Sequence, residues 1–194
     1  MARDGWSDGP VKPGVSLAWP EPGPVEVQMS DEKISGNSLQ GMDEKKIKPR
    51  LLKKMLGQEF CLSDWLTMTQ DRINAFADCT EDHQWIHVDV ERASRSPLKS
   101  TIAHGFLLLS LLPHFLAQSP LARIKVRMIF NYGLDRIRFI QPVRPGDRIR
   151  NRAVLKEIKR KGFRRWLVKI ENTLEIDGNP KPALVAELLV FVIF

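Results

Sequence analysis

Two side chains that could work as an acid and a base stand five residues apart, Asp82 and His87, in the stretch D-H-Q-W-I-H. Together they can hold one water molecule, with the imidazole taking its proton and the carboxylate orienting it. Downstream, I-A-H-G places Gly105 before the most apolar segment of the chain, Phe106 to Leu116. A glycine at a helix start lets a carbonyl oxygen approach the backbone N–H closely. The three residues could therefore activate water beside a stabilised oxyanion.

The acid and the histidine also have other interpretations. Asp82 could instead cap the loop by accepting hydrogen bonds from backbone N–H groups. His83 and His87 have the four-residue spacing of a zinc-protease helix. Gln84 replaces the glutamate that this motif uses as its base, and no third ligand is placed downstream. We therefore expect no metal.

A covalent nucleophile is not favoured by the sequence. Cys79 lies in F-A-D-C-T, a setting typical of a packed helix end, and Ser110 has no G-x-S-x-G context. Cys61 and Cys79 form no metal or redox spacing. Two reduced thiols in a cytosolic protein are expected, although one disulfide remains open.

The composition is that of a globular protein that is soluble in water. The chain has 194 residues, of which 43% are hydrophobic and 27% charged. The N-terminal segment M-A-R-D-G-W-S-D-G-P lacks the apolar core of a signal peptide. The apolar run 183–194 is shorter than the roughly 20 residues of a membrane helix, and we interpret it as a buried strand. We predict a cytoplasmic protein with no membrane partner.

The chain divides into an arm and one domain. Residues 1–45 are rich in Pro, Gly, Ser and charge, without a lasting apolar period, which indicates a disordered or extended arm. Residues 46–194 carry the periodic patterns. Within them, apolar residues nearly all round Ile102–Gln118 predict a long central helix buried on every side, with Pro113 kinking it or ending it early.

Further helices and strands are predicted on either side of the central helix. Ile47 to Met55 have helical spacing, Thr69 can cap a helix through about Ala77, and Val90–Ala93 could form one turn. From Ile124 the apolar period changes to two, and turn sequences separate five strands. One apolar helix followed by strands predicts an α+β fold with an antiparallel sheet around the helix. The predicted strands are 123–130, 135–140, 147–155, 164–172 and 183–194.

The stretch F-A-D-C-T-E-D-H-Q-W-I-H-V-D, followed by I-A-H-G, resembles the MaoC-like hydratase family, which includes the (R)-specific enoyl-CoA hydratases. Gln-Trp between the acid and the histidine is similar to the NodN-like branch. The resemblance runs from about Gly57 to Phe194. It implies a single hotdog domain, commonly paired as a homodimer with the acyl groove near the subunit interface.

The resemblance also implies a reaction. Members interconvert trans-2-enoyl thioesters and (R)-3-hydroxyacyl thioesters of CoA or acyl carrier protein. Asp82 and His87 match the acid and histidine that activate water, and Gly105 matches the glycine that donates its N–H to the thioester oxygen. The thioester is the substrate, and no cofactor is expected. The alternatives are a non-catalytic acyl-CoA-binding hotdog protein and a hotdog thioesterase, although the latter's carboxylate is missing from 105–118.

Residues flanking the catalytic groups are expected to line the substrate groove. Where the family usually has Asn-Pro, this chain has Gln84-Trp85, which should reshape the acyl pocket. His104 could fix the loop beside the site or be a structural histidine at the helix start, and we favour the structural interpretation. The expected substrate-binding residues are Gln84, Trp85, Ile102, Ala103 and His104.

Positive charge is concentrated in one region. The net charge is +7, and residues 121–165 hold fifteen Lys/Arg against three Asp/Glu. Such a region attracts the phosphates of nucleic acid or CoA, or an acidic carrier protein, or it is a solvated sheet face. Few aromatic residues interleave with the charges, so we predict no nucleic-acid partner. Candidates for binding CoA phosphates are Arg123, Lys125, Arg127, Arg136, Arg138, Arg144, Arg148 and Arg150.

Overall fold

The computed structural model describes residues 49–123 and 126–194. All of them belong to one compact unit, Lys33–Phe194. The predicted arm, residues 1–45, lies outside the described residues. In the described part, no helix is long and apolar enough to cross a membrane.

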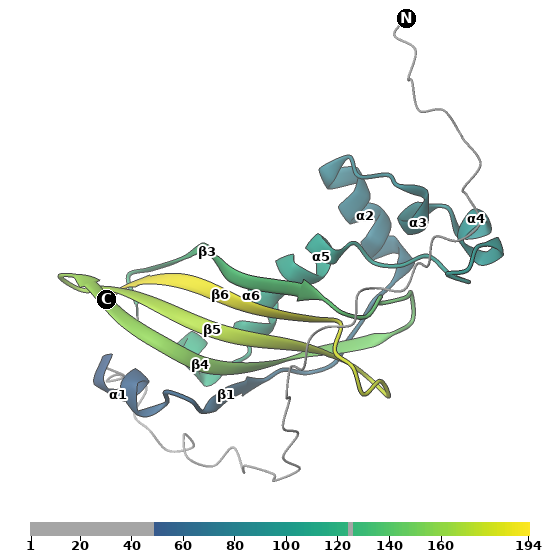
Figure 1. The fold of residues 1–194 in the computed structure, drawn as a ribbon. Helices are drawn as coiled ribbons and strands as arrows, with labels where there is room; N and C mark the ends of the chain where they lie inside the picture. The colour runs from purple at the N-terminus through teal and green to yellow at the C-terminus, as the bar shows by residue number, and fades with distance from the viewer. Residues whose placement is uncertain (1–48, 124–125) are drawn as a thin grey trace, which may run out of the picture. The chain divides into compact units, whose positions relative to one another are not determined.

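The core of the unit is an antiparallel sheet with the strand order β1-β4-β5-β6-β3, and β2 pairs with β4 beside β1 (Figure 1). The two long hairpins, β4–β5 and β5–β6, join strands that are consecutive in the sequence. The antiparallel sheet predicted from the period of two is therefore confirmed. The strands are β1 (Glu59–Leu62), β2 (Leu66–Thr67), β3 (Met128–Phe139), β4 (Arg148–Gly162), β5 (Arg165–Ile176) and β6 (Leu184–Ile193).

The other elements of the fold are short helices. The predicted Thr69 cap is confirmed, because its side chain accepts a hydrogen bond from the N–H of Arg72 at 3.2 Å. The helix that it starts, α2, continues to Thr80 and ends at Glu81 in the left-handed conformation. The helices are α1 (Pro49–Lys54), α2 (Gln70–Thr80), α3 (Trp85–Val88), α4 (Val90–Arg95), α5 (Gly105–Ser110), α6 (Leu112–Leu116) and the 3-10 helix η2 (Pro120–Arg123).

The central helix is two helices, α5 and α6, in place of the single helix predicted over Ile102–Gln118. They are separated at Leu111, because Pro113 has no N–H to donate to the carbonyl of Leu109. The first helix begins only at Gly105, since the preceding residue has an extended backbone with ψ 137°. The kink predicted from the proline is confirmed, and the predicted length is wrong.

One side of α5 and α6 packs on the inner face of the sheet. Leu107, Leu112 and Phe115 are buried there with residues of β4, β5 and β6. The expected burial on every side is wrong, since Phe106 is 69% exposed and a stripe continues through Ser110 and His114. A helix against a single sheet buries only the face that meets it.

The sequence correctly predicted strands in this region, but it divided them wrongly. β3, from Met128 to Phe139, joins the last three residues of the predicted strand 123–130 to most of the predicted strand 135–140. The expected turn at 131–133 is an irregularity in the register of β3 with β6. The strand can therefore bend without ending. β1 was missed because four residues are too few to show an alternation, although Phe60 and Cys61 are buried against the sheet.

Candidate active site

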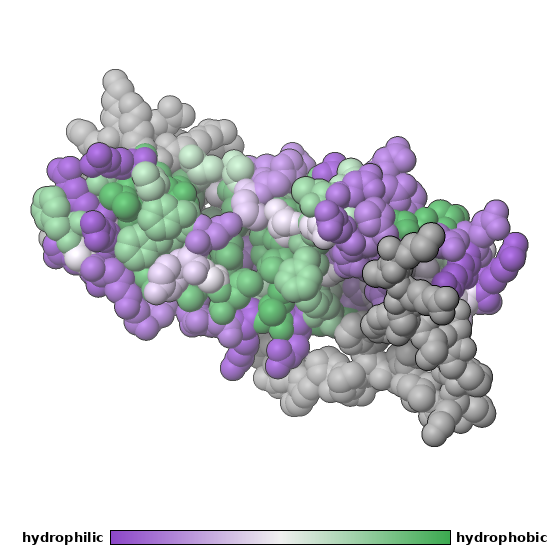
Figure 2. Space-filling model, turned by 90° about the horizontal axis from the view of Figure 1, so that it is seen from above, coloured by the Kyte–Doolittle hydropathy of each residue, from purple (hydrophilic) through white to green (hydrophobic). Residues whose placement is uncertain are grey.

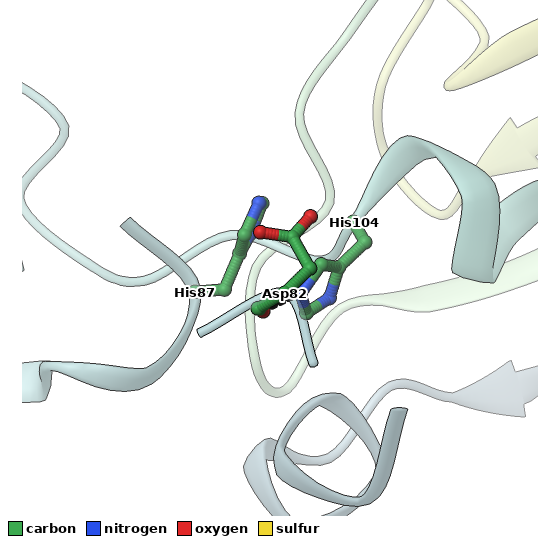
Figure 3. Close-up of side chains that lie close together, drawn as sticks. All are labelled: Asp82, His87 and His104. Carbon is green, nitrogen blue, oxygen red and sulfur yellow. Dashed lines mark hydrogen bonds between the residues drawn. The ribbon is translucent and has the colours of Figure 1, made fainter. Parts of the chain in front are cut away.

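Three segments bring the candidate catalytic residues together at one end of the sheet. Asp82 lies in the loop that follows α2, where Glu81 has φ 61° and reverses the chain direction. His87 belongs to the four-residue helix α3, which the sequence analysis did not predict. His104 precedes α5, whose first residue is Gly105. Figure 3 shows the acid and the two imidazoles side by side.

The acid and the histidines form a compact cluster. One side-chain ligand atom from each of Asp82, His87 and His104 lies within 4.8 Å of the others. Asp82 is exposed, whereas His87 and His104 are only 7% and 2% exposed. The predicted acid/histidine pair is therefore brought together, with the acid on the solvent side.

One hydrogen bond determines which nitrogen of His87 can act as a base. Its Nδ1 lies 2.7 Å from the main-chain carbonyl oxygen of Ile102. A carbonyl oxygen can only accept, so Nδ1 carries the proton and Nε2 holds the lone pair of the neutral ring. Burial lowers the pKa of His87, while the hydrogen bond to Ile102 and the charge of Asp82 act in the opposite direction. The ring is therefore suited to accept a proton at Nε2.

The backbone around His87 is held by a second set of hydrogen bonds. Gln70 donates from Nε2 to the carbonyl oxygen of His87 at 2.8 Å, and Thr101 donates its hydroxyl to Oε1 of Gln70 at 2.5 Å. The N–H of Ile102 donates to the carbonyl of Ile86 at 3.0 Å. Gln70 and Thr101 were missed by the sequence analysis, because they lie 17 and 14 residues from His87 and belong to no motif.

His104 contacts both Asp82 and His87. Its ring stacks on that of His87, with centroids 3.7 Å apart and an interplanar angle of 25°. Its Nε2 donates to the main-chain carbonyl of Asp82 at 3.0 Å. The neighbouring Ala103 is also buried. These two residues therefore support the site from within the fold.

The ring of Phe139 closely approaches Gly105. A Cβ atom added at this position would lie 2.9–3.1 Å from three ring carbons of Phe139, at the end of β3. The first N–H groups of α5 have no partner within the helix, and His104 provides no side-chain cap. The glycine thus leaves room for the Phe139 ring at the start of α5, and the first N–H groups of this helix remain available as donors.

Two of the four residues between the acid and the histidine, Gln84 and Trp85, were expected to line the substrate groove, and Trp85 contacts α4. Gln84 is exposed at the start of α3, and Trp85 is half-buried. The guanidinium carbon of Arg92 lies 4.6 Å from the centroid of the Trp85 ring, a cation–π contact. This contact forms one wall of an open cavity of about 440 Å³. The cavity is lined by Trp85, Asp89, Glu91, Arg92, Arg95 and Ser96.

The cluster offers a poor geometry for a metal ion. His83 does not join it, because its Nε2 pairs with Oδ1 of Asp78 at 2.9 Å. In the described residues, the group that could supply three ligand atoms is Asp82, His87 and His104. One nitrogen of each ring is already hydrogen-bonded to a main-chain carbonyl oxygen, Nδ1 of His87 to Ile102 and Nε2 of His104 to Asp82.

Part of the basic region faces away from this site. On β4, Ile149 is buried in the core, so Arg148 and Arg150 on either side of it point to the outer face. There they pair with Asp177 and Glu175. In these ion pairs, a carboxylate already balances the charge of each of the two candidate arginines. Lys125 lies outside the described residues.

An antiparallel sheet around a central helix, with an acid and a histidine beside the helix start, defines the class of hotdog hydro-lyases. The family model described as "MaoC like domain" matches residues 52–177. The chain belongs to the MaoC-like dehydratase family, as the resemblance indicated.

Named relatives agree with this assignment. The chain is 44% identical over 135 residues to 3-hydroxyacyl-thioester dehydratase Z of Mycobacterium tuberculosis, covering 69% of this chain and 88% of the relative. It is 45% identical over 141 residues to Nodulation protein N of Rhizobium leguminosarum bv. viciae, covering 72% and 87%. The predicted NodN-like character and the hydro-lyase class are confirmed: this chain is an enzyme of the hydratase/dehydratase type.

The fold is confirmed by solved structures. The monoamine oxidase regulatory protein from Archaeoglobus fulgius superimposes with a TM-score of 0.64 at 25% identity. The match covers 71% of this chain and 90% of that chain. The hotdog fold predicted from the sequence is therefore correct.

Proposed function

We propose that this enzyme interconverts trans-2-enoyl thioesters and (R)-3-hydroxyacyl thioesters, using Asp82 and His87 to activate water. The observation that carries the proposal is the hydrogen bond from Nδ1 of His87 to the carbonyl of Ile102. It leaves the lone pair on Nε2, in a cluster that also contains an exposed carboxylate. An acid and a base held on one water are the minimum that hydration requires.

In the hydration direction, Nε2 of His87 takes a proton from the water while the oxygen attacks C3 of the substrate. The electron pair of the C2–C3 double bond moves towards the thioester carbonyl, and the N–H of Gly105 stabilises the oxygen that gains charge. The imidazolium of His87 then returns the proton to C2 on the same face. Water is added without a covalent intermediate, and dehydration is the same path reversed.

The chain itself supplies every group that this path uses, so we propose that no cofactor takes part. Asp82 orients the water, His87 moves the proton, and Gly105 binds the oxyanion. The relative named a 3-hydroxyacyl-thioester dehydratase supports the substrate class. A carboxylate on the central helices, which a thioesterase of this fold would use, is missing from 105–118.

Four of the candidate ligands for the CoA nucleotide, Arg127, Arg136, Arg138 and Arg144, are exposed, and the test concerns Arg136 and Arg138. They are exposed on β3, close to Phe139, which contacts Gly105. In the described part of the chain, neither forms an ion pair with a carboxylate. Replacing both by Gln should raise KM for crotonyl-CoA about tenfold and leave kcat unchanged, because the lost binding is uniform. KM for crotonyl-pantetheine, which lacks the nucleotide, should not change.

We also propose that the enzyme is a homodimer joined along β3. This strand ends the described sheet, and its large apolar residues Ile129, Phe130 and Tyr132 are 53%, 41% and 63% exposed. Figure 2, seen from above, shows apolar surface among polar side chains on this side of the molecule. A long exposed apolar edge strand favours pairing with another chain. Light scattering should give about 44 kDa, twice the 22.2 kDa of the chain.

The function is tested by following the loss of enoyl-thioester absorbance with crotonyl-CoA and a longer trans-2-enoyl-CoA. The product should be the (R)-3-hydroxyacyl thioester, identified by chiral analysis. The same substrates on acyl carrier protein distinguish the two carriers. A purified, folded protein that neither hydrates enoyl thioesters nor dehydrates 3-hydroxyacyl thioesters of any length or carrier would contradict the proposal.

A further inference from the structure

We propose that His104 is a positioning residue for the reaction: it holds the backbone of Asp82 in place and supports the ring of His87 during proton transfer. The consequence for turnover rests on the proposed function, whereas the coupling between the two histidines does not. No substrate contact is assigned to His104, since it is 2% exposed.

The first part of the proposal rests on how the Asp82 loop is anchored. Asp82 is exposed, and in the described residues its carboxylate makes no hydrogen bond. Its main-chain carbonyl, however, accepts a 3.0 Å hydrogen bond from Nε2 of His104, which is 22 residues away in the sequence. This bond ties a loop that follows a left-handed residue to the start of α5. It therefore fixes where the carboxylate can reach.

The second part rests on the stacked rings. The ring centroid of His104 lies 3.7 Å from that of His87 and 5.1 Å from that of Phe76. The stacked ring of His104 restricts how far the ring of His87 can tilt, so Nε2 of His87 keeps its direction towards the water.

The hydrogen bonds of His104 differ from those expected of a residue that only fills space in the core. With Nε2 donating to Asp82, the lone pair of His104 is on Nδ1. That atom is buried and, in the described part of the chain, has no hydrogen-bond partner. A buried polar atom without a partner is unfavourable. An apolar ring of the same shape would avoid this cost, but it could not hold the Asp82 carbonyl.

The charged groups that face His87 determine in which direction its pKa should shift when His104 is replaced. Asp82 from the α2–α3 loop raises the pKa of His87, and His104 in front of α5 lowers it, in addition to the larger effect of burial. Removing the imidazole of residue 104 should therefore raise the pKa of His87. A residue that only filled space would leave this titration unchanged.

Two replacements separate the two roles. His104→Phe keeps an aromatic ring against His87 but cannot donate to the Asp82 carbonyl. His104→Gln keeps a donor of similar reach but removes the ring. Each should lower kcat by about tenfold or more with KM changed less than about twofold, because positioning affects the transition state more than binding.

His114 provides the control. It is the exposed histidine of α6 and packs against Phe115 at 5.5 Å, outside the cluster. His114→Gln should leave kcat, KM and the titration of His87 as in the wild type. With only four histidines in the chain, single replacements also assign each imidazole signal in an NMR pH titration.

The decisive experiment combines kinetics with the NMR titration of His87 in wild type, His104→Phe, His104→Gln and His114→Gln. The proposal predicts lower kcat and a raised pKa of His87 in both His104 variants. Wild-type kcat and an unchanged His87 titration in a folded His104→Phe would overturn it. If only that variant fails to fold, the same criteria apply to His104→Gln. If the wild type is inactive on thioesters, the proposed function fails while the titration still decides the coupling.

Discussion

The two catalytic candidates are held in opposite ways. His87 is buried, its ring bonds to Ile102, and Gln70 holds its backbone carbonyl. Asp82 is exposed in a loop, and among the described hydrogen bonds its tie to the fold is the one from His104 to its backbone. The base is fixed through its ring, and the acid only through its main chain.

The difference indicates a division of work. A base must present one lone pair in one direction, so its tautomer and tilt have to be fixed before the substrate arrives. A carboxylate that orients water has four acceptor sites and tolerates more freedom. Tight packing of the histidine and solvent access for the acid are therefore both expected of a site that binds and releases water in every cycle.

The largest loss of activity is expected from replacing His87, the more tightly held of the two residues. His87→Gln takes away the proton acceptor and should lower kcat by about 10³-fold, within the usual range for a positioned acid or base. The measurement is the initial rate with crotonyl-CoA. The melting temperature should stay within a few degrees of the wild type, which separates lost chemistry from lost folding. A His87→Gln enzyme with wild-type kcat would place the base elsewhere.

A smaller loss of activity should follow from disturbing Gly105, the proposed oxyanion donor. Gly105→Ala places a methyl group 2.9–3.1 Å from the ring of Phe139, so the start of α5 or the ring must move. The N–H is retained but displaced, and kcat should fall by about 10- to 100-fold. Adding Phe139→Leu makes room for the methyl group and should restore part of the activity. If Gly105→Ala alone were fully active, the close approach would have no role in catalysis.

The hydrogen bonds that hold the backbone of His87 can be removed without changing its ring. Gln70→Ala removes the bond to the His87 carbonyl and leaves the Thr101 hydroxyl buried without its acceptor. Denaturant unfolding should show a loss of about 1–3 kcal/mol, and kcat should fall by about three- to tenfold. Asn74→Ala is the matched control, because it removes the other acceptor of the same Gln70 amide at 2.8 Å. Equal effects of the two variants would argue against a specific role of the hydrogen bond from Gln70 to the His87 carbonyl.

The smallest effect concerns pH. The pKa of His87 is lowered from its ordinary value of 6.5 by burial. The unfolded chain therefore binds this proton more readily, and the stability that the neutral ring contributes is present above pH 6.5 and lost as the pH falls through the folded pKa. Unfolding curves of His87→Gln should show a weaker loss of stability over this window than the wild type. An identical pH dependence would indicate that the ring is not buried in the neutral form.

The sequence was sufficient for the parts of the site that depend on local patterns. The spacing of Asp82, His87 and Gly105 indicated an acid, a base and a helix start, and the fold brings the first two together beside the third. Alternating residues likewise indicated the strands. These features are encoded within short stretches, so a reader of the sequence can find them.

The parts that depend on distant contacts could not be read from the sequence. Gln70 and Thr101 meet His87 only after folding, and neither stands in a motif. The pairing of Arg148 with Asp177 depends on the register of β4 and β5, so the charge count alone overstated the free positive surface. The exposed stripe at Phe106 was also hidden, because periodicity shows which residues are apolar but not which faces are covered.

The central claim is that Asp82 and His87 act on the same water, and a double-mutant cycle tests it most directly. Crotonyl-CoA hydration is measured for wild type, Asp82→Asn, His87→Gln and the double variant, all with confirmed folding. Because residues acting as one unit are not additive, the double variant should be no more than about threefold slower than the slower single variant. If the two losses multiply in full, the residues act independently and the proposed site is wrong.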